Sequence, residues 1–287
     1  MYILVCLAST SGGIILLRYF QEGTFIMKTH IPTCPSQCER LYEGKAKVLY
    51  ATNEPDTLWV EYKNHTTAFD GEKDANIEGK GQLNNLITTH VFTLLETQGI
   101  RTHLIKRVGP TSQIVRRMKM FPLEIVVRNT AAGHFCTRLG VKEGELLKEP
   151  VLEFYLKNDE LHDPFVNDDD LIALGVCTRK DLNEIASLAR HVNKTLTKLF
   201  ADIDIRLVDF KIEAGRASDG SLLLGDEITP DSCRLWNLRR NAVGEAASDE
   251  VQHLDKDLFR RDLGDIIPAY EEVEHRLAQL ITKRKLQ

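Results

Sequence analysis

The strand-turn-strand pattern of residues 207–227 constrains the fold of this chain more than any other feature of its sequence. Apolar and charged residues alternate strictly from 208 to 213, which predicts a β-strand with one face in the core and one charged face. The core face carries Val208, Phe210 and Ile212, and the charged face carries Asp209, Lys211 and Glu213. A turn signal, Asp219-Gly220, then leads into a second strand over 222–227. The segment therefore predicts a β-hairpin with a row of charges along one side.

The turn also predicts which residues face each other across this hairpin. A two-residue turn at Asp219-Gly220 pairs residue 218 with residue 221. Counting outward from this pair places Glu213 opposite Asp226. A bulge near Gly215 would shift this register by one residue and separate the two carboxylates.

Two carboxylates directly opposite each other lie ~5 Å apart at Cβ and repel, so a cation is expected between Glu213 and Asp226. Oxygen ligands suit Mg²⁺, which takes one or two carboxylates and completes its shell with water and nucleotide phosphate. Lys211 lies one pleat away and can contact the same phosphates. On this pattern alone, a surface hairpin with ion pairs along its charged face is an equally good interpretation.

Polar residues in other segments are weak signals when each is taken alone. Lys45 and Lys47 flank the start of a predicted strand, but the spacing of a Walker A phosphate loop is absent. Arg128 ends another predicted strand and is typical of an ordinary ion-pair partner, as is Lys157.

A loop beside the charged hairpin holds two further candidates. Arg234 can bind phosphate or carboxylate with its planar fork, and Asp231 can accept hydrogen bonds from sugar hydroxyls or an amine. The alternative is a capped loop that Trp236 anchors.

The 287-residue chain has 43% hydrophobic residues, enough for a full core, and its net charge of −5 gives no global basic field for nucleic acid. We expect an α+β fold in two lobes, with antiparallel sheets and a helical C-terminal segment over 256–283 that breaks near Ile267-Pro268. The expected domains are an extension over 1–40, a nucleotide-loop lobe over 41–122 and a substrate and metal domain over 123–287. Strands are expected at 46–52, 57–62, 102–107, 113–117 and 123–128, and helices at 81–98 and 179–200.

The first 26 residues match neither a membrane span nor a secretory signal, because small and polar residues interrupt a short apolar stretch. We therefore expect the native chain to start at Met27. The six scattered cysteines are typical of reduced thiols, which predicts a cytoplasmic protein.

Five motifs in order resemble the phosphoribosylaminoimidazole-succinocarboxamide synthase (SAICAR synthetase) family. They are Leu-Tyr-Glu-Gly-Lys-Ala-Lys (41–47), Val-Val-Arg-Asn-x-Ala-Ala-Gly (126–133), Leu-Lys-Asn-Asp with His-Asp-Pro (156–164), Val-Asp-Phe-Lys-x-Glu (208–213), and Gly-Asp-Glu-x-x-Pro-Asp with Arg-Leu-Trp (225–236). The resemblance runs from about residue 41 to the C-terminal helix. It implies a two-lobed fold related to ATP-grasp enzymes.

The resemblance also implies an activity: ATP- and Mg²⁺-dependent ligation of L-aspartate to the carboxylate of carboxyaminoimidazole ribonucleotide (CAIR) in purine biosynthesis, through an acyl phosphate, in a cytoplasmic homodimer. It assigns residues by role. Nucleotide binding falls to Lys45, Ala46, Lys47, Val115, Met120 and Lys157, metal binding to Glu213 and Asp226, catalysis to Asp209 and Lys211, and substrate binding to Arg128, His134, Asp231 and Arg234.

One departure from the family pattern concerns His134, since serine commonly follows Ala-Gly there. Histidine can still donate a hydrogen bond but is bulkier. The segment 69–81 is a candidate lid and aspartate-site loop. Two other functions compete with the ligase: a small-molecule kinase that stops after phosphoryl transfer, and a non-catalytic nucleotide-binding regulatory module.

Overall fold

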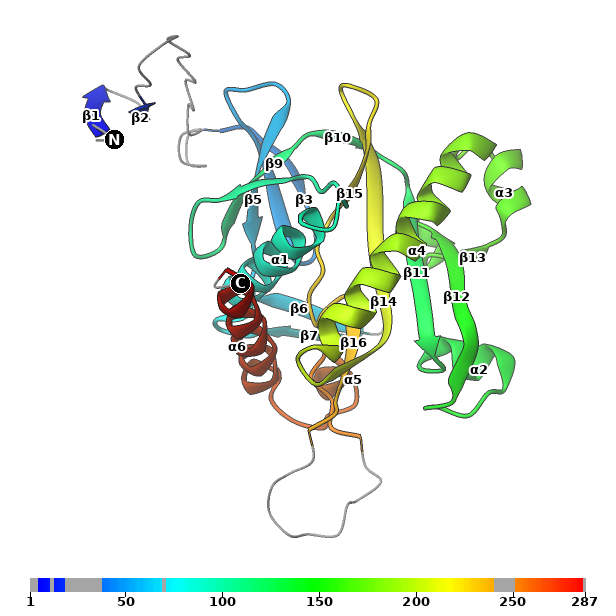
Figure 1. Ribbon diagram of the computed structural model, residues 1–287. Helices are drawn as coiled ribbons and strands as arrows, with labels where there is room; N and C mark the ends of the chain where they lie inside the picture. Colours follow the sequence, from blue (N-terminus) through cyan, green and yellow to red (C-terminus); the bar gives the residue numbers. More distant parts are fainter. Residues whose placement is uncertain (1–4, 11–12, 19–37, 69–70, 240–250, 286–287) are drawn as a thin grey trace.

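Two large antiparallel sheets and the helices packed on them form most of the described part of the protein in the computed structural model, together with two two-stranded ribbons (Figure 1). The structure describes residues 5–10, 13–18, 38–68, 71–239 and 251–285. Helices and antiparallel strands follow one another along the chain, which confirms the predicted α+β class.

The first sheet has five strands in the order β3, β4, β5, β9, β8. Their bounds are Arg40–Glu43 (β3), Lys47–Ala51 (β4), Thr57–Tyr62 (β5), Ser112–Arg116 (β9) and Leu104–Arg107 (β8). The predicted hairpin of 46–52 and 57–62 is confirmed by the pairing of β4 with β5. A separate ribbon, β6 (His65–Ala68) with β7 (Lys73–Asn76), follows β5.

The second sheet is organised around one long strand, β14, which pairs with four others. Its members are β10 (Met118–Met120), β11 (Leu123–Thr130), β12 (Leu146–Leu156), β13 (Phe165–Val166), β14 (Ile205–Ala217), β15 (Leu222–Gly225) and β16 (Cys233–Asn237). Because β14 spans 13 residues and receives partners on both edges, side chains from distant segments meet along it.

Three long helices cover the sheets: α1 (Lys80–Glu96), α4 (Arg179–Ala201) and α6 (Ile266–Lys285). The helices predicted at 81–98 and 179–200 are therefore confirmed. At the end of α1, Gly99 adopts a left-handed φ of 80°. At the start of α4, Thr178 and Asp181 form a capping box. Short helical segments complete the fold: α2 (His134–Leu139), a 3₁₀ turn (Asp159–Leu161), α3 (Asp168–Ala173) and α5 (Asp257–Arg260).

The C-terminal segment is helical, but its break lies slightly earlier than predicted. The chain leaves helical conformation between α5 and α6, and Pro268 lies in the first turn of α6, where its missing N–H costs no hydrogen bond. Among the described helices, none is long and apolar enough to cross a membrane.

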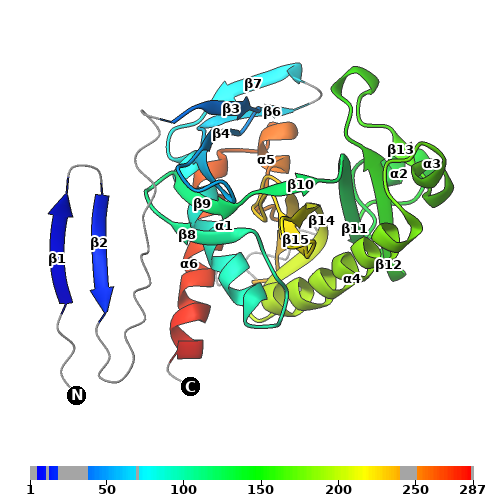
Figure 2. The same cartoon turned by 90° about the horizontal axis from the view of Figure 1, so that it is seen from above.

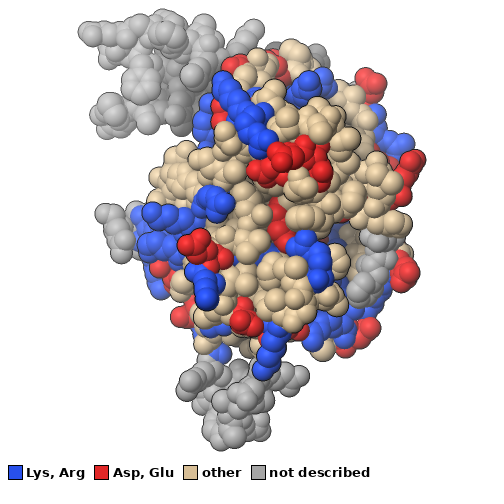
Figure 3. Space-filling view, turned by 90° about the vertical axis from the view of Figure 1, so that its right-hand side faces the viewer, with Lys and Arg blue, Asp and Glu red and all other residues tan. Residues whose placement is uncertain are grey.

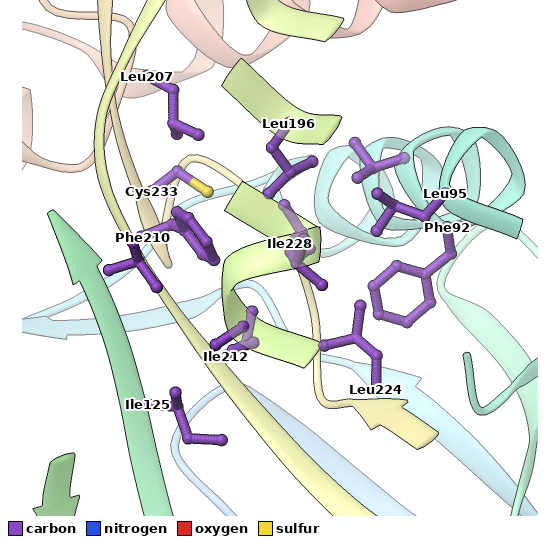
Figure 4. Packing of buried hydrophobic residues seen from close by; sticks show 14 of the residues in the cluster. Phe92, Leu95, Ile125, Leu196, Leu207, Phe210, Ile212, Leu224, Ile228 and Cys233 are labelled. Carbon is purple, nitrogen blue, oxygen red and sulfur yellow. The ribbon is translucent and has the colours of Figure 1, made fainter. Parts of the chain in front are cut away.

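One apolar core joins the two sheets through the helices. Phe92 and Leu95 from α1 and Leu196 from α4 converge with side chains of β14 such as Phe210 and Ile212 (Figure 4). Viewed from above, α1 and α6 run beside the first sheet, and α4 runs along the second (Figure 2).

Two predicted segments fall partly outside the described residues. Met27 lies outside them, and the described parts of the N-terminal extension include β1 (Val5–Thr10) paired with β2 (Gly13–Arg18). In the candidate lid, residues 69 and 70 lie outside the described part. The rest of that segment contains β7 and the first residues of α1.

Candidate active site

The site is built on β14, along which Asp209, Lys211 and Glu213 follow one another at every second position. Asp209 and Glu213 are buried, with exposed fractions of 4% and 6%. Buried carboxylates are unfavourable without cationic or hydrogen-bonding partners, so their neighbours define the site. The core face is also largely as predicted, because Phe210 and Ile212 lie in the main core.

Val208 is an exception to the predicted core face. The pairing of β14 with β16 slips between Leu207 and Asp209, which leaves Val208 as the extra residue of a β-bulge. Val208 therefore packs with Ala132 and Trp236 in a separate small cluster.

Three lysines and four carboxylates meet at one end of the row, which we call the lysine end: Lys47, Lys157, Lys211, Glu124, Glu213, Asp226 and Glu227. Lys211 Nζ lies 3.1 Å from Glu124 Oε1, 3.4 Å from Glu213 Oε1 and 3.4 Å from Asp226 Oδ2. Lys157 Nζ donates to Glu213 Oε1 at 2.7 Å. Lys47 Nζ lies 2.5 Å from Asp226 Oδ1 and 3.3 Å from Glu227 Oε2.

Protonation at the lysine end follows from burial and these contacts. Burial opposes the charge on Lys211, but Asp226 and Glu213 outweigh it and raise its pKa. Burial likewise opposes ionisation of Asp226, yet Lys47 and Lys211 lower its pKa. For Glu227 burial prevails over Lys47, and its pKa is raised. The site thus keeps its lysines charged and contains one carboxylate that gains a proton more easily than its neighbours.

The predicted hairpin register is wrong by one residue. Glu213 pairs with Gly225, not with Asp226, because the turn contains three residues rather than two. Ala217 N donates to Ser221 O, and Gly220 takes a left-handed φ of 79°, as in a three-residue hairpin loop.

The predicted proximity of the two carboxylates nevertheless holds, since both contact Lys211 Nζ at 3.4 Å. Asp226 has a left-handed φ of 56°, just past the end of β15. In a regular strand, the residue after Gly225 would point to the face opposite Glu213. The left-handed backbone at Asp226 turns its carboxylate back toward the site.

The lysine end fits a divalent cation bound by Glu213 and Asp226. Its donors are carboxylate oxygens, the ligands that Mg²⁺ prefers. Four carboxylates face only three lysines, so the cluster has a deficit of positive charge when all seven are ionised. Glu227 Oε2 is buried and accepts no hydrogen bond. Lys47 and Lys211 already lie against Asp226, and they would share its oxygens with the metal.

The loop at residues 44–47 lies over the lysine end and is held by its carbonyl groups. Gly44 O accepts from Lys63 Nζ at 3.3 Å, and Ala46 O accepts from the backbone N–H of Lys63 at 2.8 Å. Lys45 O lies 2.9 Å from Nδ1 of His65. The Lys45 side chain itself is 60% exposed, with its Nζ 3.5 Å from Asp159. The structure therefore brings Lys47 into the site and leaves Lys45 at its rim.

The residues expected to flank adenine lie on consecutive strands of the two sheets: Val115 on β9 of the first and Met120 on β10 of the second. Val115 is buried in β9 and packs with Tyr62, whose ring centroid is 5.1 Å from Lys47 Nζ. Met120 is 39% exposed on β10. Its Cε would lie 3.4 Å from a Cβ built on Gly225, the residue before Asp226.

Arginines dominate the other end of the row, where charges alternate from residue to residue. We call it the arginine end, and its members in order of contact are Arg138, Glu153, Arg128, Asp209, Arg234, Asp257 and Arg260.

Asp209 is at the centre of the arginine end, because its Oδ2 accepts from Arg128 Nη1 and Arg234 Nη1, both at 2.8 Å. Arg128 Nε also donates to Glu153 at 2.6 Å, and Arg234 Nε donates to Asp257 at 2.9 Å. Burial disfavours the charge on Arg234, but Asp209 and Asp257 outweigh it and raise its pKa. Each guanidinium is thus fixed by two carboxylates.

A cavity of about 300 Å³ opens between the two ends. It is lined by Glu124, Val126, Arg128, Asp209, Phe210, Lys211, Asp231, Ser232, Cys233, Arg234 and Arg260. Four arginines against three carboxylates give the arginine end a surplus of positive charge, which suits an anionic group. On the face shown in Figure 3, acidic and basic side chains lie beside one another rather than in separate patches of one sign.

His134 is exposed at the start of α2, next to the arginine end. The preceding Gly133 lies against Arg234, since a Cβ added there would be 2.4 Å from Arg234 Nη2. Gly133 also has a φ of 55°, so a side chain at this position would be both strained and obstructed. The structure therefore places Gly133, the residue before His134, against Arg234.

Asp231 has protein partners on both carboxylate oxygens. Its Oδ1 accepts from the Tyr270 hydroxyl at 2.7 Å, and its Oδ2 lies 2.5 Å from Lys80 Nζ and accepts from Asn84 at 2.7 Å. Burial raises the pKa of Asp231, but Lys80 and Lys256 outweigh it, and the pKa is lowered. Asp231 thus joins α1, α6 and the loop before β16, and it also lines the cavity.

Several partners in the site were missed from the sequence. Glu124 could have been found from the sequence, because Glu124, Val126 and Arg128 lie on one face of β11. On β14, Lys211 pairs with Val126 and Asp209 pairs with Arg128. Glu153 on β12, Asp257 on α5 and Lys80 on α1 carried no such signal, since only the tertiary fold brings the first two to the arginine end and Lys80 to Asp231.

Among the described residues, one further group of possible metal ligands is His253, Asp255 and Asp257. Asp257 already binds Arg234 and Arg260. Asp255 accepts from the backbone N–H groups of Leu235 and Asp257. These carboxylates therefore support the loop structure around the arginine end.

The SAICAR synthetase family model matches residues 40–277. The chain is 70% identical over 242 residues to the phosphoribosylaminoimidazole-succinocarboxamide synthase of Bifidobacterium adolescentis, covering 84% of this chain and 94% of the relative. The crystal structure of the synthase from Ehrlichia chaffeensis has a TM-score of 0.78 at 39% identity, covering 84% of this chain and 98% of that one. A SAICAR synthetase in complex with ADP has a TM-score of 0.76 at 43% identity, covering 82% and 96%. The chain belongs to the SAICAR synthetase family and has its mixed α+β fold, as the five motifs predicted.

Proposed function

We propose that this protein ligates L-aspartate to the carboxylate of CAIR at the expense of ATP, which gives SAICAR, ADP and phosphate. Its family makes it a C–N ligase of purine biosynthesis. The observation that carries the proposal is the opposite charge imbalance at the two ends of β14. A cation deficit suits a metal with nucleotide phosphate, and a cation surplus suits the phosphate of a ribonucleotide.

A carboxylate is a poor electrophile, so it must first be activated. We infer that the terminal phosphoryl group of ATP passes to a CAIR carboxylate oxygen, which forms an acyl phosphate and releases ADP. The aspartate amine then attacks the acyl carbon, phosphate leaves with the C–O electron pair, and the amine loses a proton as the amide forms.

The lysines have a direct role in this chemistry. Lys47, Lys157 and Lys211 are held charged by carboxylates, and such preorganised cations stabilise the charge that develops on a transferring phosphoryl group. Glu213 and Asp226 would hold Mg²⁺, which supplies charge neutralisation for the phosphates. Lys45 and Ala46 would complete the nucleotide loop, with Val115 and Met120 beside the base.

The arginine end would orient the ribonucleotide. Arg128 and Arg234 are fixed by Asp209, so their forks are preorganised for a phosphate or carboxylate. Asp231 would contribute from the cavity wall, and His134 would donate from the start of α2. Holding the substrate carboxylate near the lysine end is the positioning that such a ligation requires.

The decisive experiment follows product formation by purified enzyme with ATP, Mg²⁺ and CAIR, with and without L-aspartate. We expect SAICAR only when aspartate is present, together with stoichiometric ADP. ADP release that ignores aspartate would support a kinase instead. Nucleotide binding without any turnover would support a regulatory module.

Assembly and location are part of the same proposal. We propose a homodimer in the cytoplasm, where the free thiols of Cys136, Cys177 and Cys233 would stay reduced. Light scattering during gel filtration tests the dimer, and a mass of about 33 kDa, that of one chain, would contradict it.

A further inference from the structure

His65 is the first residue of β6, and its ring lies between the loop of residues 44–47 and β7, with both ring nitrogens engaged. Its Nδ1 is 2.9 Å from the backbone oxygen of Lys45. Its Nε2 is 2.5 Å from Asp74 Oδ2 on β7. The ring is 29% exposed, so it is packed between these segments while remaining in reach of solvent.

Both neighbours of the ring are acceptors. A backbone carbonyl can only accept a hydrogen bond, so Nδ1 must carry a proton. The Asp74 side chain is 58% exposed, and an ionised carboxylate also only accepts. Nε2 must then carry a proton as well. A neutral imidazole has one N–H and can satisfy only one of the two contacts.

We propose that His65, in its doubly protonated form, is a positioning residue whose ring links the loop of residues 44–47 to Asp74 on β7. This inference rests on the proposed role of residues 45–47 in nucleotide binding. The cationic ring donates to Lys45 O on one side and to Asp74 on the other. Loss of either proton leaves one acceptor facing a lone pair, and the ring then no longer links the loop to β7.

The remaining charged groups around His65 are compatible with its charge. Lys80 on α1 donates from Nζ to the His65 carbonyl oxygen at 3.2 Å, and its own charge is paired with Asp231 at 2.5 Å. The side chain of Lys45 is directed toward Asp159. Among the charged groups that the structure describes here, Asp74 is the one in direct contact with the ring.

Two substitutions separate the contacts. The amide nitrogen of His65→Asn lies near the position of Nδ1, and that of His65→Gln lies near the position of Nε2, so each variant keeps one contact at most. At pH 6 we expect both variants to raise the KM for ATP about tenfold, the effect of one charge-assisted hydrogen bond, with kcat changed less than threefold. His275→Gln is the matched control, because His275 is exposed on α6 and contacts Gln279.

The pH dependence separates a protonated positioning residue from a merely structural one. Histidines change charge between about pH 5 and 8. The ratio of the variant KM to the wild-type KM should fall from about ten at pH 6 toward one at pH 8.5, where the wild type has lost the same contact. Asp74→Asn should keep the KM that the wild type has at pH 6 at both pH values, since an amide can accept from a protonated Nε2 and donate to a neutral one.

Nitrogen-15 NMR of the histidine rings tests the protonation state in the protein without nucleotide. We expect both ring nitrogens of His65 to be protonated at pH 6, with the signal assigned by its loss in His65→Gln. A singly protonated ring at pH 6, or a KM ratio near one there, overturns the proposal. Failure of the proposed function would appear separately, as absence of aspartate-dependent product from the wild type.

Discussion

The lysine end and the arginine end lie on the same strand, yet they hold charge in different ways. At the lysine end, Lys211 is shared among three carboxylates at 3.1–3.4 Å. At the arginine end, Arg128 and Arg234 each use separate nitrogens to bind two carboxylates at 2.6–2.9 Å. A lysine ammonium is a point charge that can follow a moving group, whereas a guanidinium fork fixes a stationary one. The contrast matches the proposed division of roles, with phosphoryl transfer at the lysine end and substrate anchoring at the arginine end.

The largest expected effect comes from a lysine that belongs to neither end. Lys80 is fully buried against Asp231, and Lys80→Met would leave that carboxylate without the cation that contacts it. We expect a loss of about 3–5 kcal/mol in the free energy of unfolding, measured with urea. Asp231→Asn added to Lys80→Met should recover part of it. A loss below about 1 kcal/mol would show that Asp231 does not depend on Lys80.

The next largest effect should distinguish the two ends by their substrates. Glu213→Gln and Asp226→Asn keep side-chain size but remove the proposed metal ligands from the lysine end. Each should lower turnover at least ~100-fold, the scale of losing one preorganised electrostatic group. Steady-state kinetics at saturating Mg²⁺ measure this, with exposed Glu149→Gln on β12 as the control. Turnover within a few-fold of wild type would contradict the proposal that these residues bind the metal.

Arg234→Lys tests whether the arginine end requires the planar guanidinium group and its several N–H donors. A lysine cannot bind Asp209 and Asp257 through separate nitrogens as Arg234 does. We expect the KM for CAIR to rise about 10–100-fold while the KM for ATP stays within twofold, as for loss of a hydrogen bond between charged groups. The control is Arg206→Lys, an exposed arginine on the same strand. Equal changes in both KM values would contradict the division into two ends.

The smallest effect is expected outside both ends, at the start of α4. Thr178→Ala removes the helix cap and should cost about 1 kcal/mol at pH 7, with activity unchanged. Hydrogen bonds from Thr178 and Arg216 lower the pKa of Asp181 to about 2 in the folded protein. Since an unfolded aspartate titrates near pH ~3.9, this stabilisation is present above pH ~4 and is lost as pH falls toward 2. Urea unfolding of the wild type and of Thr178→Ala, at pH 7 and near pH 2, measures the difference in their free energies of unfolding. This difference should not be larger at the lower pH.

The fold was largely predictable because its signals are local. Alternation identified β14, helical spacing identified α1 and α4, and the five motifs identified the family. The hairpin register was not predictable, because Asp219-Gly220 is compatible with a two- or a three-residue turn and only the fold selects one. For the same reason the sequence could not show that Asp226 reaches the site through a left-handed backbone. Partners such as Glu153 and Asp257 come from other elements and carry no pattern of their own.

The backbone of the loop at residues 44–47 is oriented by the hydrogen bonds that its carbonyl groups accept. The carbonyl oxygens of Gly44, Lys45 and Ala46 all face residues 63–65. In a planar trans peptide, the N–H group points away from the C=O group. The N–H groups of residues 45–47 therefore point away from that segment, and successive N–H groups on one side form a concave anion-binding surface. The loop is a polarised backbone element, and part of its proposed attraction for phosphate does not depend on the side chain at position 45.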